Sequence, residues 1–96
     1  MKKQVEKSPV LVSEGQVHGY RVVYEQIPTS WGAYAPDLPG LGVVGDSREE
    51  VERLIAEAIP IHLEELALDR QERPWLYRSE ELSPELRAIF ARIDAA

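Results

Sequence analysis

The acidic residues are the first candidates for chemistry in this sequence, which has 17 Asp and Glu among its 96 residues. Metal-assisted hydrolysis needs several carboxylates that converge on divalent ions. Glu25 stands near the end of an expected strand, whereas Asp37 and Asp46 stand at expected turns. Turn stabilisation explains Asp37, and complementarity to a helix dipole explains Asp46. We therefore predict no catalytic residue and no metal site.

The chain offers equally little for nucleophilic or acid-base catalysis. His18 precedes the first clear strand, and His62 flanks the apolar face of an expected helix, where a half-buried packing role is common. The chain has no cysteine, and the sequence places no serine beside either histidine. The pattern predicts no thiol nucleophile, no general base and no cofactor.

Length, charge and composition describe one acidic domain. The 96 residues and the 44% hydrophobic content suffice for a single modest core. The formal net charge of -6, with its 11 basic residues scattered, disfavours direct nucleic-acid binding and suits a basic protein partner. The charged N-terminal residues lead into no apolar segment of signal-peptide or membrane-span length. Because the absence of cysteine also suits a reducing compartment, we expect a cytoplasmic protein with no membrane partner.

Proline and glycine divide the middle of the chain into short strands. Residues 20–28 are rich in aromatic and β-branched side chains, and residues 31–35 follow so closely that the two segments predict an antiparallel hairpin. Pro36 and Pro39 cannot donate to a ladder, so the second strand must end there. Residues 41–44 then predict a third strand that returns beside the second.

The period of the apolar residues changes to that of a helix after this strand. Ser47 and Glu50 have the spacing of a capping box, which predicts a helix start. Pro60 falls inside the pattern, but the apolar stripe keeps its phase, so we predict one kinked helix that ends near residues 69–72. The stripe comprises Val51, Leu54, Ile55, Ala58, Ile59, Leu63 and Leu66, with Glu52, Arg53, Glu57, Glu64 and Glu65 on a solvated face.

The two ends of the chain are less strongly patterned. Residues 9–17 could be a short strand or a flexible arm, with a turn signal at residues 13–16. Residues 74–77 are aromatic and predict an edge strand or a strap across the sheet. The Ser83-Pro84-Glu85 signal starts a short helix, whose apolar face would cover the sheet or form a dimer contact through Leu86, Ile89, Phe90 and Ile93.

These elements predict an α+β fold, in which a small antiparallel sheet of three or four strands in the order β-β-β-α-β packs on one long helix, followed by a short C-terminal helix. Residues 1–19 would be an arm or short strand and residues 20–72 the core, while residues 73–96 would serve dimerisation or partner docking. Because such a sheet leaves a face and an edge uncovered, we expect a homodimer or higher homo-oligomer.

The residues at the joints between the elements resemble the HicB family of type II antitoxins. The segment YAPDLPGLGVVGDSREEVERLIAEAI is similar to the family pattern of an aromatic or apolar residue before PDLPG, a short run into GDT or GDS, and a helix that opens with paired glutamates. Leu41 and Val51 replace a common cysteine and alanine and keep apolar character. The matching residues with an expected structural role are Pro36, Asp37, Pro39, Gly40, Gly45, Asp46, Ser47 and Glu50.

The resemblance implies a partial ribonuclease-H-like fold and a non-catalytic antitoxin. Its partner would be a small, basic HicA-type mRNA interferase, which the acidic chain would bind and occlude. Many family members append a helix-turn-helix or ribbon-helix-helix segment, but the tail after residue 67 shows one clear helix and few cations, so DNA binding is not expected. The residues predicted to bind the partner are Trp31, Tyr34, Asp37, Asp46 and Glu49.

Three alternatives remain open from the sequence. The first is a stand-alone protein-interaction or oligomerisation domain with no toxin partner. The second is an antitoxin that also represses transcription. The third and least favoured alternative is a metal-dependent nuclease.

Overall fold

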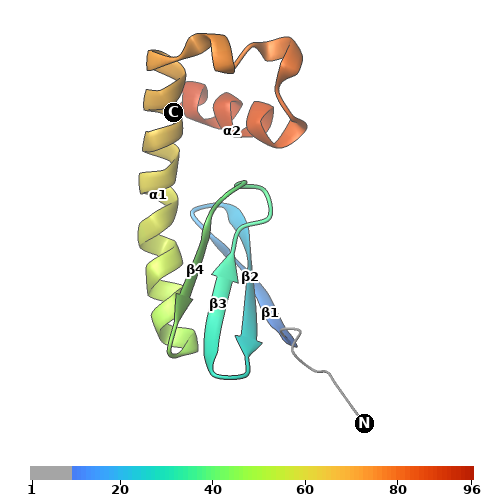
Figure 1. Cartoon of the computed structure of the whole chain (residues 1–96), viewed down its shortest axis with the longest axis vertical. Helices are drawn as coiled ribbons and strands as arrows, with labels where there is room; N and C mark the ends of the chain where they lie inside the picture. Colours follow the sequence, from blue (N-terminus) through green and yellow to red (C-terminus); the bar gives the residue numbers. More distant parts are fainter. Residues whose placement is uncertain (1–9) are drawn as a thin grey trace.

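The computed structural model describes residues 10–96, with side chains from residue 13 onward. One layer is a four-stranded antiparallel sheet whose strands lie side by side in chain order, β1-β2-β3-β4 (Figure 1). The four strands are β1 Val10–Val17, β2 Tyr20–Ile27, β3 Ser30–Tyr34 and β4 Gly42–Gly45. The predicted hairpin and the returning third strand are confirmed, as is the α+β class.

β1 is a full strand where the sequence left a choice between a strand and an arm. Residues 13–16, which were predicted to turn, instead pair with residues 21–24 of β2, and a β-bulge separates Leu11 from Ser13. The turn lies further along, at His18 and Gly19, where φ is 52° and 81°. Positive φ at both central residues is the geometry of a two-residue hairpin that matches the twist of its strands.

The long helix α1 runs from Arg48 to Glu72 without interruption and lies along one side of the sheet, against β3 and β4. Its side chains Val51, Ile55 and Ile59 are fully buried, which confirms the predicted apolar stripe. Pro60 is exposed on the opposite side of the helix. The predicted single helix across Pro60 is therefore confirmed.

Pro60 has no N–H group, so it cannot form the helical hydrogen bond to the carbonyl of Ala56. His18 supplies the missing donor, because its Nε2 atom lies 2.9 Å from the Ala56 oxygen. The ring reaches this carbonyl from the turn between β1 and β2, where His18 holds a positive φ that is uncommon for residues other than glycine. His18 thus has a structural role that joins the sheet to α1.

The C-terminal part differs from the predicted strand. Residues Pro74–Leu76 form the 3₁₀ helix η1, Ser79–Glu81 form a second, η2, and Pro84–Ala95 form helix α2. The order is thus β-β-β-β-α-α, with the fourth strand at the N-terminal end of the chain rather than after α1. The N-cap of α2 is confirmed, because the Leu86 N–H donates to Ser83 Oγ over 3.2 Å.

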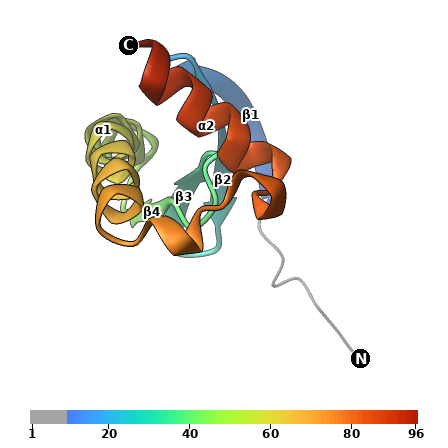
Figure 2. The same ribbon diagram turned by 90° about the horizontal axis from the view of Figure 1, so that it is seen from above.

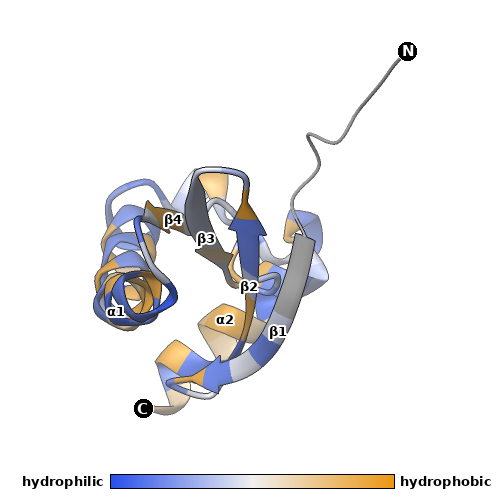
Figure 3. Ribbon diagram, turned by 90° about the horizontal axis from the view of Figure 1, so that it is seen from below, coloured by the Kyte–Doolittle hydropathy of each residue, from blue (hydrophilic) through white to orange (hydrophobic). Residues whose placement is uncertain are grey.

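Both helices lie on the same side of the curved sheet (Figures 2 and 3). The sheet flanks the first half of α1, and α2 packs beside the second half (Figure 1). We call this the helix side of the sheet and the opposite face its open side. One core joins the sheet to both helices, and its most deeply buried large side chains are Leu38, Ile55, Ile59, Ile89, Val22 and Val51.

Candidate protein-binding surfaces

The PDLPG segment forms the connection between β3 and β4. Leu38 is only 1% exposed and packs in the core. Its N–H donates to the Ala35 carbonyl at 2.9 Å, and its own carbonyl accepts from the Leu41 N–H at 3.2 Å. Gly40 has a φ of 84°, which a side chain would strain. The segment is therefore a tight turn anchored by one buried leucine, with Asp37 exposed beside it.

The GDS segment forms the N-terminal cap of α1. Ser47 Oγ accepts from the Glu50 N–H at 3.1 Å, as a capping box requires. The Glu50 carboxylate accepts a hydrogen bond from the N–H of Asp46 at 2.6 Å. Asp46 is the residue before the N-cap, Ser47. A Cβ atom at Gly45 would lie 2.8 Å from Glu50 Oε1, so a side chain there would displace this carboxylate from its present position.

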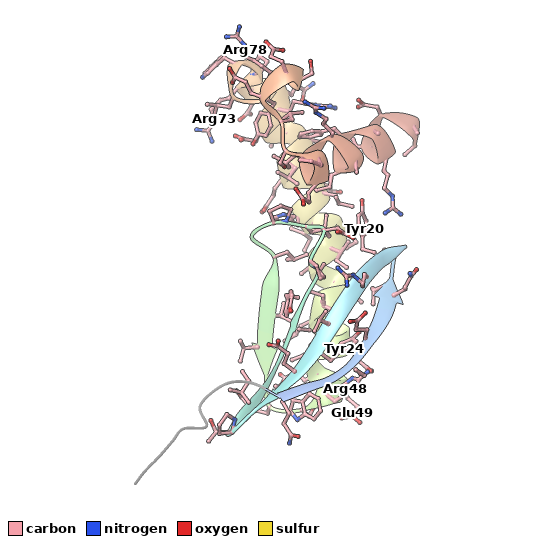
Figure 4. The ribbon with its side chains drawn as sticks, turned by 90° about the vertical axis from the view of Figure 1, so that its right-hand side faces the viewer. Tyr20, Tyr24, Arg48, Glu49, Arg73 and Arg78 are labelled. Carbon is pink, nitrogen blue, oxygen red and sulfur yellow. The ribbon has the colours of Figure 1, made fainter. Side chains whose placement is uncertain are left out.

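Arginine and tyrosine close the end of the core beside this cap. The guanidinium of Arg48 lies 4.1 Å from the centre of the Tyr24 ring and also donates to Glu52 at 3.0 Å. Burial raises the pKa of the Tyr24 hydroxyl, and the nearby Glu52 carboxylate raises it further. Figure 4 shows Tyr24, Arg48 and Glu49 together at this end, and Tyr20 at the other end of β2.

The five residues predicted to bind a partner do not form one site. Trp31 is half-buried and packs against the core from the helix side, whereas Tyr34 is 38% exposed on the open side. Asp37 lines a hollow of about 350 Å³ with Tyr20 and Arg92 near α2. Asp46 and Glu49 are exposed at the opposite end of the sheet, beside the start of α1.

The apolar face of α2 packs on the core of its own chain, which is one of the two roles considered for it from the sequence. Ile89 and Phe90 are 1% and 4% exposed, and Leu86 and Ile93 pack against the same core. Ile89 and Phe90 are therefore inaccessible to a second copy of the chain, whereas Leu86 and Ile93 are half-buried. Of the two roles considered from the sequence, covering the core is the one that the structure shows.

Charged side chains fasten α2 to the second half of α1. The Arg70 guanidinium lies 4.2 Å from the centre of the Phe90 ring and forms a two-pronged pair with Asp94, with N–O distances of 2.7 and 3.3 Å. The Tyr77 ring meets Phe90 edge-on, with ring centres 5.5 Å apart. Tyr77 also donates its hydroxyl hydrogen bond to Asp69, which accepts from Arg73 as well.

These hydrogen bonds shift the pKa values of Asp69, Tyr77 and Asp94. The hydroxyl of Tyr77 and the guanidinium of Arg73 lower the pKa of Asp69, and the bond to Arg70 lowers the pKa of Asp94. The same carboxylate of Asp69 raises the pKa of Tyr77. A lowered aspartate pKa stabilises the folded state above the usual value of about 3.9, and a raised tyrosine pKa stabilises it below about 10.

We therefore expect the attachment of α2 to weaken in acid. The stabilisation from Asp69 and Asp94 is lost as the pH falls through their lowered pKa values, and that from Tyr77 is lost as the pH rises through its raised value. When the pH is lowered from 7 to 2, the amide NMR shifts of residues 84–95 should change at a higher pH than those of β2. Asp69→Asn should reduce the size of this change in the shifts of α2. Simultaneous changes in α2 and β2, unaffected by the substitution, would contradict this assignment.

A second set of exposed residues runs along the outer side of α1, away from the sheet. It consists of four glutamates and two apolar residues at three- and four-residue spacing, and we call it the acidic stripe. The sequence predicts a solvated face for three of these glutamates, Glu57, Glu64 and Glu65, but gives no such role to the two apolar residues, which are 54% and 53% exposed. The members are Glu57, Ile61, Glu64, Glu65, Leu68 and Glu72.

The apolar members of the stripe had a detectable signal in the sequence. Ile61 and Leu68 are seven residues apart and thus on one face of the helix, and neither belongs to the buried stripe that contains Ile55 and Ile59. Two large apolar residues in register on the polar side of an amphipathic helix are not required by the core. They are therefore a candidate contact surface for another molecule.

The residues with catalytic potential stay apart. Glu25 lies on the open side of β2, while Asp37 and Asp46 lie near opposite ends of the sheet. Within residues 10–96, no three His, Asp or Glu side chains gather as metal ligands would. His62 is half-buried on α1, as predicted, and its Nε2 atom has no hydrogen-bond partner in the described part of the chain.

Comparison with known proteins finds no relative. No family model, no curated protein and no solved structure matches the chain. The resemblance to the HicB family therefore depends on the sequence pattern of residues 34–59 described above. Neither α1 nor α2 has an apolar stretch of the length needed to cross a membrane, and the search covered residues 10–96.

Proposed function

We propose that this protein is a non-catalytic, HicB-like antitoxin that binds a small basic HicA-type mRNA interferase and covers its RNA-binding face. It would act in the cytoplasm and without a cofactor. The observation that carries the proposal is the acidic stripe of α1, which combines exposed negative charge with exposed apolar residues on a rigid helix. Protein interfaces of this kind use charge to guide association and apolar contact to hold the complex.

Three of the four stripe glutamates form no ion pair in the described part of the chain. Glu52 and Glu57 pair with Arg48 and Arg53, at 3.0 and 3.6 Å. Glu64, Glu65 and Glu72 are exposed and form no ion pair within residues 10–96. The stripe thus offers a negative surface to a cationic partner, in keeping with the net charge of -6.

A stand-alone interaction domain is the second candidate. The C-terminal region favours it over an antitoxin that also binds DNA. α2 buries its apolar face in the core, and the preceding turns η1 and η2 are short. A helix-turn-helix would need two helices with one of them free to enter a DNA groove. The separation of Glu25, Asp37 and Asp46 gives no support to the nuclease alternative.

The antitoxin proposal predicts a partner encoded beside this gene. A short neighbouring open reading frame with a basic product should co-purify with this chain after joint expression, and its ribonuclease activity should be suppressed in the complex. Because opposite charges steer the encounter, the association rate should fall about tenfold or more between 50 and 500 mM salt. An association rate independent of salt would contradict the electrostatic argument, and an active complex would contradict occlusion.

A further inference from the structure

We infer that the acidic stripe of α1 is a docking site for a cationic amphipathic helix, whose apolar residues pack against Ile61 and Leu68. The inference rests on the proposed function, since it names the surface and the chemistry of the partner. The partner helix would carry apolar residues at three- and four-residue spacing, with Lys or Arg on both sides of them. It would lie along α1 as a neighbouring helix.

The shape of the stripe fits a helix. Its members follow the helical repeat from Glu57 to Glu72, a length of about 22 Å at the usual rise per residue. Ile61 and Leu68 stand in one column, separated by two turns, with Glu64 and Glu65 on either side of the column. A partner helix of about four turns would therefore meet apolar residues along its centre and carboxylates along both margins.

The two apolar residues are not explained by folding. The buried stripe that contains Ile55 and Ile59 faces the sheet, and the part of α1 beside α2 buries its contacts on the same side. Ile61 and Leu68 are each more than half exposed on the other side. Polar residues at these positions would serve the isolated chain equally well, because exposed apolar surface has no stabilising role in water.

Charge decides which partner the stripe fits. A second copy of the chain would bring Glu57, Glu64, Glu65 and Glu72 against an identical set, and like charges across an interface are costly. Exposed apolar side chains also lie on the open side of the sheet, at Tyr34 and Val44, and on η1, at Trp75 and Leu76. The open side carries Glu14, Arg21 and Glu25, with Glu14 facing Arg21 at 3.9 Å, and η1 stands between Arg73 and Arg78. Within residues 10–96, the stripe is the exposed apolar surface whose neighbouring charges are four glutamates on one helix face.

A synthetic peptide tests the surface without the natural partner. The probe is a fluorescent 21-residue helix with Leu at the a and d positions of its heptads and Lys elsewhere, and binding is followed by anisotropy. Ile61→Ser with Leu68→Ser, and separately Glu64→Gln with Glu65→Gln, should each weaken binding about tenfold or more. All four positions are solvent-exposed or nearly so, and circular dichroism should show native helix content.

The chain offers matched controls for both changes. Val44→Ser removes an apolar side chain that is 66% exposed on the sheet. Glu80→Gln with Glu81→Gln removes an adjacent, exposed glutamate pair from η2. Each control should change the affinity less than about twofold. A peptide with Glu in place of Lys should not bind. Equal weakening by test and control variants would overturn the inference.

Two further results separate this inference from the proposed function. If a cognate basic toxin binds and the Ile61 and Leu68 substitutions leave its affinity unchanged, the docking site is wrong while the antitoxin proposal stands. If the peptide binds the stripe but no neighbouring basic protein co-purifies, the surface stands and the antitoxin proposal fails. Sedimentation that shows a dimer of the wild-type chain, abolished by the same two substitutions, would identify a second copy as the occupant and overturn the inference.

Discussion

Phe90→Ala should lower the free energy of unfolding by about 3–5 kcal/mol, the range for loss of a buried aromatic side chain. Phe90 is 4% exposed, and its ring meets the edge of Tyr77 and lies beneath the guanidinium of Arg70. The substitution removes both contacts and leaves a cavity between α1 and α2. Because α2 is too short to persist alone in water, it should lose much of its helical structure as well.

Urea denaturation at two protein concentrations, tenfold apart, would measure this effect. Because Phe90 is buried within one chain, the loss of stability in Phe90→Ala should be the same at both concentrations. Trp75→Ala is the matched control, because Trp75 is 63% exposed, and it should change stability within about 0.5 kcal/mol. A wild-type midpoint that rises with concentration, and loses that dependence in Phe90→Ala, would restore the dimer contact that the sequence suggested.

Leu38→Ala should cost about 2–5 kcal/mol, as expected for a leucine truncated in a packed core. Leu38 lies at the centre of the PDLPG segment, yet its side chain is 1% exposed and belongs to the cluster that joins the sheet to both helices. The alanine would leave a cavity beneath the turn between β3 and β4. We therefore expect the segment to act first as architecture, whatever partner the protein binds.

The neighbouring residue separates architecture from recognition. Asp37 is exposed beside Leu38, so Asp37→Ala should change the free energy of unfolding within about 0.5 kcal/mol. Thermal and urea denaturation of the two variants, measured in parallel, would compare them directly. A small effect of Leu38→Ala together with a large effect of Asp37→Ala would mean that the carboxylate, and not the buried leucine, holds the turn.

Local signals were sufficient to predict the middle of the chain. Pro36 and Pro39 had to end a strand, and Ser47 with Glu50 had to begin a helix, because each of these residues acts on its own backbone. β2, β3, β4 and the start of α1 accordingly lie where the sequence placed them, within one or two residues. The continuity of α1 across Pro60 followed from the phase of its apolar residues, which is also a local property.

Elements that depend on distant partners could not be predicted in the same way. Residues 13–16 have the composition of a turn, but the ladder with β2 holds them extended, so tertiary pairing overrides the local preference. Residues 74–77 have the composition of a strand, but they contact α1 rather than a sheet edge. With Pro74 at the first position, they form a single 3₁₀ turn instead.

In the candidate functional surfaces, too, the sequence predicted the features that depend on neighbouring residues and missed those that depend on distant ones. The sequence placed glutamates on the outer face of α1, but the exposure of Ile61 and Leu68 required knowledge of which side the sheet covers. The partner of His18 is 38 residues away in the chain, so its bond to Ala56 had no signal in the sequence. The three arginines that lie over aromatic rings, Arg48, Arg70 and Arg92, likewise depend on the packed structure.

The strand order of the sheet has a consequence for how the protein reaches its native state. Because each strand pairs with its sequence neighbour, the β-meander has a low contact order and should form quickly, even while the chain is emerging from the ribosome. α2 is different, since its Arg92 bonds to the Gly19 carbonyl across 73 residues. We therefore expect α2 to close late in folding over a preformed sheet and helix, so that the apolar core beneath it stays exposed until α2 docks.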